Sequence, residues 1–176
     1  ILYTARSDDF REEIGQRKAA DRCRYLGLDG VICIGGDGTF RGARALSKYG
    51  INVIGVPGTI DNDISCTNYC IGFDTAANTA IQCIDKLRDT MQSHERCSVV
   101  EVMGRNAGHI AVNAGLACGA IAILIPELPY DVDKDIVEKI KASQKTGKQH
   151  FIVMVAEGIG HSEELAKEIE AKTGVE

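Results

Sequence analysis

The 176-residue chain carries a formal net charge of -5, with its 20 Lys and Arg residues scattered along the sequence. Nucleic-acid binding needs a basic face or stripe, so this charge pattern argues against a nucleic-acid partner. The longest apolar run, at residues 120–125, is far shorter than the roughly 18 residues of a spanning helix, and we expect no membrane segment. The length suits one domain or two small interlocked lobes.

Neither the cysteines nor the histidines have metal-ligand spacing. The seven cysteines form no CxxC pair and lie mostly in apolar stretches, so we expect reduced core residues of a cytoplasmic protein. We assign no transition metal to the four histidines. Because no signal peptide precedes Ile1, we expect the chain to begin inside a longer gene product.

The first part of the chain alternates helix and strand patterns. Apolar residues at helical spacing predict an amphipathic helix over 10–25, and the continuous apolar run 30–34 predicts a buried strand. This strand leads into Gly35-Gly-Asp-Gly-Thr39, where we expect a loop and then a helix. A second strand is expected over 51–56, with a polar loop over 57–68.

The remainder of the chain continues this alternation after a long helix at about 74–92. The later elements are predicted as strand 97–102, loop 103–106, helix 107–117, strand 120–125, helix 133–144, strand 151–156 and helix 162–172. Strands that alternate with helices predict an α/β fold with parallel, helix-covered sheets. Ligands bind at the carboxyl ends of such strands, where we expect every polar motif to lie.

The first polar motif is Gly35-Gly-Asp-Gly-Thr39. Its glycines allow the backbone to approach phosphates, and the following helix N-terminus favours negative charge. Asp37 covers no core at this position, so it is a candidate metal-side carboxylate; a glycine-rich turn with a solvated Asp is the alternative. The motif resembles NAD kinases and diacylglycerol kinases as well, so it indicates nucleotide-dependent phosphoryl transfer without naming the acceptor.

The second polar motif is Pro57-Gly-Thr-Ile-Asp-Asn-Asp63. Asp61 and Asp63 point to different sides of an extended loop and can do different work. This motif resembles the 6-phosphofructokinase family, and the stretch from Arg96 to Arg105 closely matches the same family. Glu157 stands where that family has a carboxylate that hydrogen-bonds the sugar, although alone it could be a solvated loop charge.

The resemblance runs from Thr4 to Gly174, essentially the whole chain. It implies a two-lobed α/β subunit, with residues 1–72 in a nucleotide-binding lobe and 73–176 in a sugar-phosphate-binding lobe. The implied reaction moves the γ-phosphoryl of ATP, with Mg2+, to the 1-hydroxyl of fructose 6-phosphate. Such a reaction asks a protein mainly for positioning and charge neutralisation.

The resemblance also assigns roles to single residues. Asp61 is the general base, Asp37 holds the nucleotide-bound Mg2+, and Asp63 assists near the metal. Arg6 and Arg105 neutralise charge on the transferring group, and Thr59 positions the phosphoryl group or the hydroxyl. The other implied contacts are Gly36, Gly38, Thr39 and Gly42 for the nucleotide, and Arg96, Met103, Gly104 and Glu157 for the sugar phosphate.

In the family, Arg96 reaches into a neighbouring subunit's site, which implies a homo-oligomer. The family's nucleotide loop should precede Ile1 and its 6-phosphate clamps should follow Glu176, so we expect the isolated chain to fold without measurable kinase activity. Arg88 matches an effector-site arginine of bacterial members. Ile121 stands where those members have an acidic residue, which places an ADP-type switch in doubt.

Two alternatives remain at this point. The chain could be a non-catalytic module retained for oligomerisation, or part of a pyrophosphate-dependent phosphotransferase. The pyrophosphate-using branch of the family replaces Gly38 with aspartate and Gly58 with lysine, and neither replacement is present. A turn that demands positive φ could also explain both glycines. The two glycines therefore favour ATP.

Overall fold

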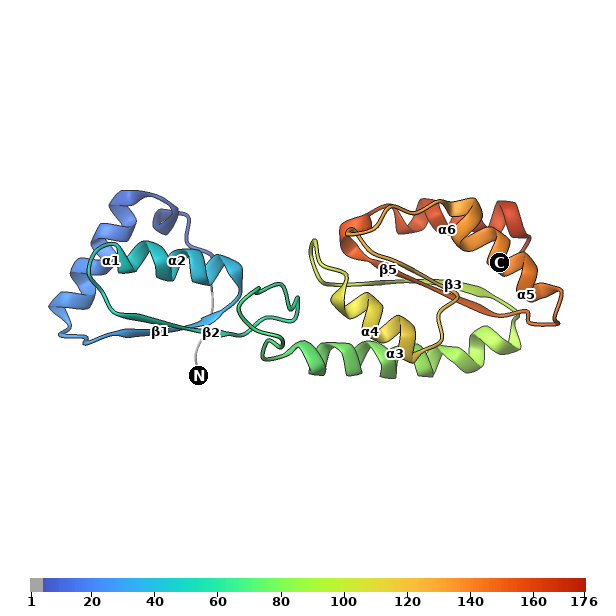
Figure 1. Ribbon diagram of the computed structural model, residues 1–176, viewed down its shortest axis with the longest axis horizontal. Coiled ribbons are helices and arrows are strands. Elements are labelled where there is room, and N and C mark those ends of the chain that lie inside the picture. The colour runs from blue at the N-terminus through green and yellow to red at the C-terminus, as the bar shows by residue number, and fades with distance from the viewer. Residues whose placement is uncertain (1–4) are drawn as a thin grey trace. The chain divides into compact units, whose positions relative to one another are not determined.

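The structure, a computed structural model, describes residues 5–176 and divides into two compact units. The first comprises Ile1–Thr59 with Asp63–Asn68, and the second comprises Ile60–Asn62 with Tyr69–Glu176. Each unit contains parallel strands with helices packed on them (Figure 1). The predicted parallel α/β fold is therefore confirmed, whereas the assignment of a nucleotide lobe and a sugar-phosphate lobe stays a prediction.

The first unit alternates short helices with two strands. Its elements are η1 (Asp9–Arg11), α1 (Glu13–Tyr25), β1 (Val31–Gly35), α2 (Asp37–Ser47) and β2 (Val53–Pro57). The helix predicted from residue 10 is a 3-10 turn followed by α1, because Glu12 between them is extended. The expected loop after β1 is also shorter than predicted, since α2 already begins at Asp37.

The sheet of the first unit is covered on one face. β1 pairs with β2 in parallel, with Val31 opposite Val53 and Ile32 opposite Ile54. Val31 and Val53 pack on a small core that contains Ala20, from α1, and Leu46, from α2. Alternation along the strands sends Ile32 and Ile54 to the other face, where their exposed fractions are 66% and 64%.

The second unit is larger and has a fully covered sheet. Its elements are α3 (Phe73–Ser93), β3 (Cys97–Val102), α4 (His109–Ala117), β4 (Ala122–Leu124), η2 (Asp133–Val137), α5 (Glu138–Gln144), β5 (Phe151–Ala156), η3 (Glu157–Ile159) and α6 (Ser162–Thr173). The helix predicted over 133–144 is one π-helical turn, η2, continued by α5. The predicted strand 120–125 shortens to β4.

The strand β5 lies at the centre of this sheet, in the order β3-β5-β4, and all six of its residues are buried. Phe151, Val153 and Val155 pack with residues of α5 and α6, while Ile152 and Met154 pack with residues of α3 and α4. Figure 1 shows these two pairs of helices on opposite faces of the sheet. A continuous apolar run is the pattern that a strand buried on both faces requires.

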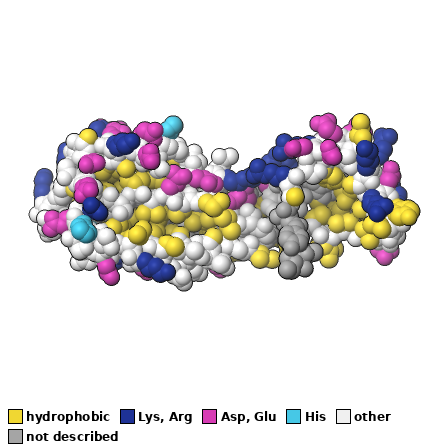
Figure 2. All heavy atoms as spheres, turned by 180° about the vertical axis from the view of Figure 1, so that it is seen from behind, with side chains coloured by type: hydrophobic (Ala, Val, Ile, Leu, Met, Phe, Trp, Pro, Cys, Tyr) yellow, Lys and Arg dark blue, Asp and Glu magenta, His cyan; other side chains and the backbone are white. Residues whose placement is uncertain are grey.

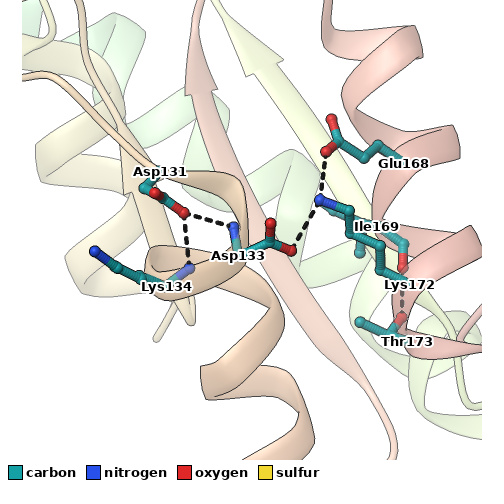
Figure 3. Close-up of polar contacts among 7 residues, drawn as sticks. All are labelled: Asp131, Asp133, Lys134, Glu168, Ile169, Lys172 and Thr173. Carbon is teal, nitrogen blue, oxygen red and sulfur yellow. Dashed lines mark hydrogen bonds and ion pairs between the residues drawn. The ribbon is translucent and has the colours of Figure 1, made fainter.

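A polar network joins the start of the π-helical turn to α6 (Figure 3). The Asp131 carboxylate accepts hydrogen bonds from the backbone N–H groups of Asp133 and Lys134, and the bond from Lys134 is the main reason that the pKa of Asp131 is lowered. Lys172 of α6 forms ion pairs of 2.8 Å with Asp133 and 2.7 Å with Glu168, which raise its pKa. These contacts fix the end of α6 against η2.

The surface, the cysteines and the helix lengths complete the description of the fold. Charged side chains of both signs are interspersed on the face drawn in Figure 2, with hydrophobic side chains between them. All seven cysteines are free, and burial raises the pKa of the Cys97 thiol to about 11. Among the helices of residues 5–176, none is long and apolar enough to cross a membrane.

Candidate functional site

The first polar motif and the start of the second, Pro57-Gly-Thr59, follow neighbouring strands of the first unit. Gly35, the last residue of β1, pairs with Pro57, the last residue of β2. The backbone N–H of Gly58 donates to the carbonyl of Gly35 over 3.0 Å, so the strand pairing continues into the motifs. Both motifs therefore leave the sheet at the same edge, as expected for the carboxyl ends of parallel strands.

The glycines of the first motif differ in what surrounds them. A Cβ atom at Gly35 would lie 2.3 Å from Oγ1 of Thr39, and one at Gly36 would lie 3.3 Å from Cβ of Thr59. The strand end thus packs directly on two threonines that the sequence places in the site. A Cβ atom at Gly38 would meet nothing within 4 Å.

Gly38 and Gly58 are also outside the positive-φ region, so their conformation does not demand glycine. A Cβ atom at Gly58 would lie 3.2 Å from Ile34, a contact that a small shift relieves. A Cβ atom at Gly42 would likewise lie 3.2 Å from the Phe10 ring, and a shift of the same size would relieve that contact. Packing within the protein thus disfavours a side chain slightly at Gly42 and Gly58 and not at all at Gly38.

The first turn of α2 carries Asp37. Its carboxylate forms a short ion pair with Arg41 one helical turn later, and this hydrogen bond raises the pKa of the Arg41 guanidinium. Among residues 5–176, no cluster of three or more His, Cys, Asp or Glu side chains could hold a metal. Mg2+ is commonly held by one or two carboxylates together with nucleotide phosphates, so a single Asp37 fits a nucleotide-bound Mg2+ but no stand-alone metal site.

A left-handed residue separates the two carboxylates of the second motif. Asn62 has φ 54°, a conformation that asparagine tolerates better than most residues. Its Oδ1 accepts a hydrogen bond of 2.8 Å from the backbone N–H of Cys70. The Asn62 side chain therefore helps to fix the turn that lies between Asp61 and Asp63 in the chain.

In the second unit, the loop after β3 meets the residue after β5. The backbone N–H groups of Gly104 and Arg105 both donate to Oε1 of Glu157, the former over 3.2 Å. Met103 is 62% exposed and Arg105 is exposed as well. The structure thus brings together four of the residues that the sequence assigned to a sugar-phosphate site, with two side chains directed to solvent and the backbone held by a carboxylate.

Arg105 adopts a strained conformation in this loop. Its φ is 54°, which costs a residue with a Cβ atom on the order of 1 kcal/mol. Gly104 before it has φ 146°, where glycine is required. Strained residues held by surrounding contacts are typical of functional sites, and the two amide bonds to Glu157 supply such contacts.

Arg96 lies at the opposite end of β3. It precedes the strand, whereas Met103 follows it, and a strand of six residues spans about 20 Å. The motif Met103-Gly-Arg105 thus follows the carboxyl end of β3, as expected, whereas Arg96 lies at the amino end of the strand. Its guanidinium forms two hydrogen bonds with the Glu176 carboxylate, of 3.2 and 3.0 Å.

Two further predicted residues lie apart from these groups. Arg6 is exposed in the segment before η1, and Thr4, where the family resemblance begins, lies outside the described residues. Arg88 donates a hydrogen bond of 2.9 Å to the carbonyl of Cys118.

Comparisons with known proteins agree with the motifs. A sequence model of the Phosphofructokinase family matches residues 1–176. The chain belongs to the phosphofructokinase family. The ATP-dependent 6-phosphofructokinase of Clostridium tetani (strain Massachusetts / E88) is 55% identical over 175 residues, which cover 99% of this chain and 54% of that protein. The enzyme of the same name from Brevibacillus brevis (strain 47 / JCM 6285 / NBRC 100599) is 54% identical over 176 residues, or 100% and 55% of the two chains.

Solved phosphofructokinases share the fold. The phosphofructokinase of Saccharomyces cerevisiae superposes with a TM-score of 0.87 at 30% identity, over 100% of this chain and 28% of that one. The Pichia pastoris phosphofructokinase in the T-state gives 0.86 at 32% identity, over 98% and 22%. The chain spans about half the length of the curated relatives it matches.

Three contacts near the candidate site were not predicted from the sequence. The pairing of Arg41 with Asp37 could have been found, because residues four apart lie on one face of a helix. The turn at Asn62 is consistent with asparagine but is not dictated by it. Glu127, which accepts a hydrogen bond of 2.8 Å from the Gly108 amide, left no sequence signal because it acts through a contact 19 residues away.

Proposed function

We propose that the protein transfers the γ-phosphoryl of ATP to the 1-hydroxyl of fructose 6-phosphate in the cytoplasm, forming fructose 1,6-bisphosphate and ADP. The observation that carries this proposal is the pairing of the two motif-bearing strands, which sends Gly35-Gly-Asp-Gly-Thr39 and the start of the second motif, Pro57-Gly-Thr59, from one sheet edge. The identity of 55% with an enzyme named ATP-dependent 6-phosphofructokinase supports the choice of donor and acceptor.

In this mechanism the chain positions the reactants and neutralises charge. Asp61 accepts the proton of the sugar 1-hydroxyl, and Thr59 positions the hydroxyl or the phosphoryl group. Arg6 and Arg105 stabilise the negative charge of the transferring group. A nucleotide-bound Mg2+ supplies charge neutralisation at the phosphates.

The nucleotide side of the reaction falls to the first motif and α2. Asp37 would hold the Mg2+, which requires the exposed Arg41 side chain to leave it, and Asp63 assists near the metal. The backbone of Gly36, Gly38 and Thr39 offers amide groups at a helix N-terminus, where phosphate binds favourably. We assign residues 1–72 to this nucleotide lobe and 73–176 to the sugar-phosphate lobe.

The sugar side falls to Met103, Gly104 and Glu157, which meet at one edge of the larger sheet. Arg96 would serve the site of a neighbouring subunit, so we propose a homo-oligomer. Arg96 and Met103 are separated by the length of β3, and one sugar phosphate cannot contact both ends of a strand of six residues. This separation supports the assignment of Arg96 to the site of another subunit.

The open space at Gly38 supports ATP as the donor. Neither φ nor internal packing requires glycine there, so room for a ligand is the remaining reason for its absent side chain. A pyrophosphate-dependent enzyme would not need that room. Initial rates with each donor, at saturating fructose 6-phosphate and Mg2+, test this choice on the protein at its full natural length.

We expect a rate with ATP that exceeds the rate with pyrophosphate many times over. Asp61→Ser should lower kcat by about three or more powers of ten and leave substrate KM nearly unchanged, the signature of a transition-state role. Asp89→Ser removes an exposed carboxylate from α3 and serves as the control. A pyrophosphate rate equal to the ATP rate, or an Asp61→Ser enzyme that keeps a tenth of the wild-type kcat, would contradict the proposal.

A further inference from the structure

The loop from Met103 to Gly108 joins the end of β3 to the start of α4 and is held at both of its ends. Glu157, directly after β5, accepts hydrogen bonds from the Gly104 and Arg105 amides at the first end. Glu127 accepts one of 2.8 Å from the Gly108 amide at the second end. The two carboxylates therefore bracket the loop from the segments that follow the other two strands of the same sheet, β5 and β4.

The side chains of Ile125 and Glu127 pack closely on the backbone of Gly108. A Cβ atom at Gly108 would lie 2.3 Å from Cγ2 of Ile125 and 2.9 Å from Oε2 of Glu127, so only glycine permits this approach. A Cβ atom at Gly158 would lie 2.5 Å from the carbonyl oxygen of Arg105. The loop thus lies directly against the segments that carry both carboxylates.

Gly108 lies in a buried part of the loop, next to the exposed Glu127. Gly104, Ala107 and Gly108 are buried, and the hydrogen bond from the Ala107 amide to the Gly104 carbonyl, of 2.9 Å, already closes the turn within the loop. A buried amide that loses its acceptor favours rearrangement of the backbone until it finds another. Loss of the Glu127 carboxylate would therefore shift the segment that holds Arg105 in its left-handed conformation.

We propose that Glu127 is a positioning residue that, together with Glu157, fixes the Met103–Gly108 loop so that Met103 and Arg105 face the sugar phosphate. Glu127 itself lies outside the sugar contacts and acts through the Gly108 amide. The inference rests on the proposed function for its kinetic consequence, whereas the loop geometry stands by itself.

Kinetics of variants in the protein at its full natural length test the consequence. Glu127→Ala should lower kcat/KM for fructose 6-phosphate by about tenfold or more, as small displacements of positioning contacts do, and leave the KM for ATP within about twofold. Glu127→Gln keeps an acceptor oxygen and should recover most of the loss. Glu138→Ala, which removes an exposed carboxylate at the start of α5, should behave as wild type.

Hydrogen exchange tests the geometry without reference to activity. The Gly108 amide should exchange at least about tenfold faster in Glu127→Ala, with β5 amides unchanged, because the bond it loses is local. Unchanged exchange at Gly108, equal acceleration in β5, unaltered kinetics, or a Gln variant as impaired as the Ala variant would each overturn the proposal. If the wild-type protein turned over no fructose 6-phosphate, the proposed function would fail, and the exchange result would still decide whether Glu127 holds the loop.

Discussion

The two units hold their loops in different ways. In the first unit, the strand end at Gly35 packs on Thr39 through the absence of a side chain, and the sheet behind it is covered on one face. In the second unit, Glu157 and Glu127 fasten a loop by hydrogen bonds to its amides, and the sheet is buried on both faces. Packing at a glycine uses no hydrogen bonds of the loop backbone, so the loop amides can donate to a ligand. A carboxylate that accepts from loop amides uses those donors, and ligand binding then falls to the loop side chains.

The largest expected difference between the units lies in their cores. Ile140 is fully buried in the second unit, so Ile140→Ala should lower the free energy of unfolding by about 2 to 5 kcal/mol. Ile32 is 66% exposed in the first unit, and Ile32→Ala should cost less than about 1 kcal/mol. Urea titration of the 176-residue chain measures both. A cost of about 2 kcal/mol or more for Ile32→Ala would mean that another surface packs on this face.

A smaller effect separates two glycines of one motif. Gly35→Ala forces a Cβ atom against Thr39 and should cost about 1 to 3 kcal/mol of stability. Gly38→Ala meets open space in the first turn of α2 and should cost nothing, with a gain of up to about 1 kcal/mol. Thermal unfolding of the two variants compares them directly. Equal losses would show that the motif tolerates no side chain for a reason other than packing.

The smallest expected effect concerns strain in the second unit. Arg105→Gly should be more stable than Arg105→Ala by about 0.5 to 1 kcal/mol, because glycine adopts φ 54° without a steric penalty. At the next residue, Asn106, which lies outside the positive-φ residues, the Gly variant should be no more stable than the Ala variant. Chemical denaturation of the four variants measures their free energies of unfolding. The same ranking of Gly and Ala at both positions would show that Arg105 is not strained.

Apolar patterning predicted the larger unit well because burial dictates that pattern. The strand at 151–156 was predicted with its observed bounds, since six consecutive apolar residues leave no other interpretation between polar neighbours. Patterning could not place the start of α2 at Asp37, because a glycine-rich motif contains no apolar residue to mark a helix face. It could not separate η2 from α5 either, since one π-helical turn barely alters the apolar spacing.

The contacts of the candidate site also differ in how far the sequence predicts them. The proximity of Gly104 to Glu157 was predictable, since both follow neighbouring parallel strands. The position of Arg96 at the amino end of β3 was predicted as well, since it precedes the strand in the sequence. The bond of Glu127 to Gly108 depends on how closely the side chains of residues 125 and 127 pack on the Gly108 backbone, which no single residue type indicates.

The length of β3 sets the separation between Arg96 at one end and the Met103–Gly108 loop at the other. Each residue of the strand has a partner in β5, from Cys97 with Phe151 to Val102 with Ala156. One inserted residue would move every later side chain of the strand to the opposite face, and two would displace Arg96 from the loop by about 7 Å. An insertion within this strand therefore disturbs the sheet more than a substitution by another apolar residue does.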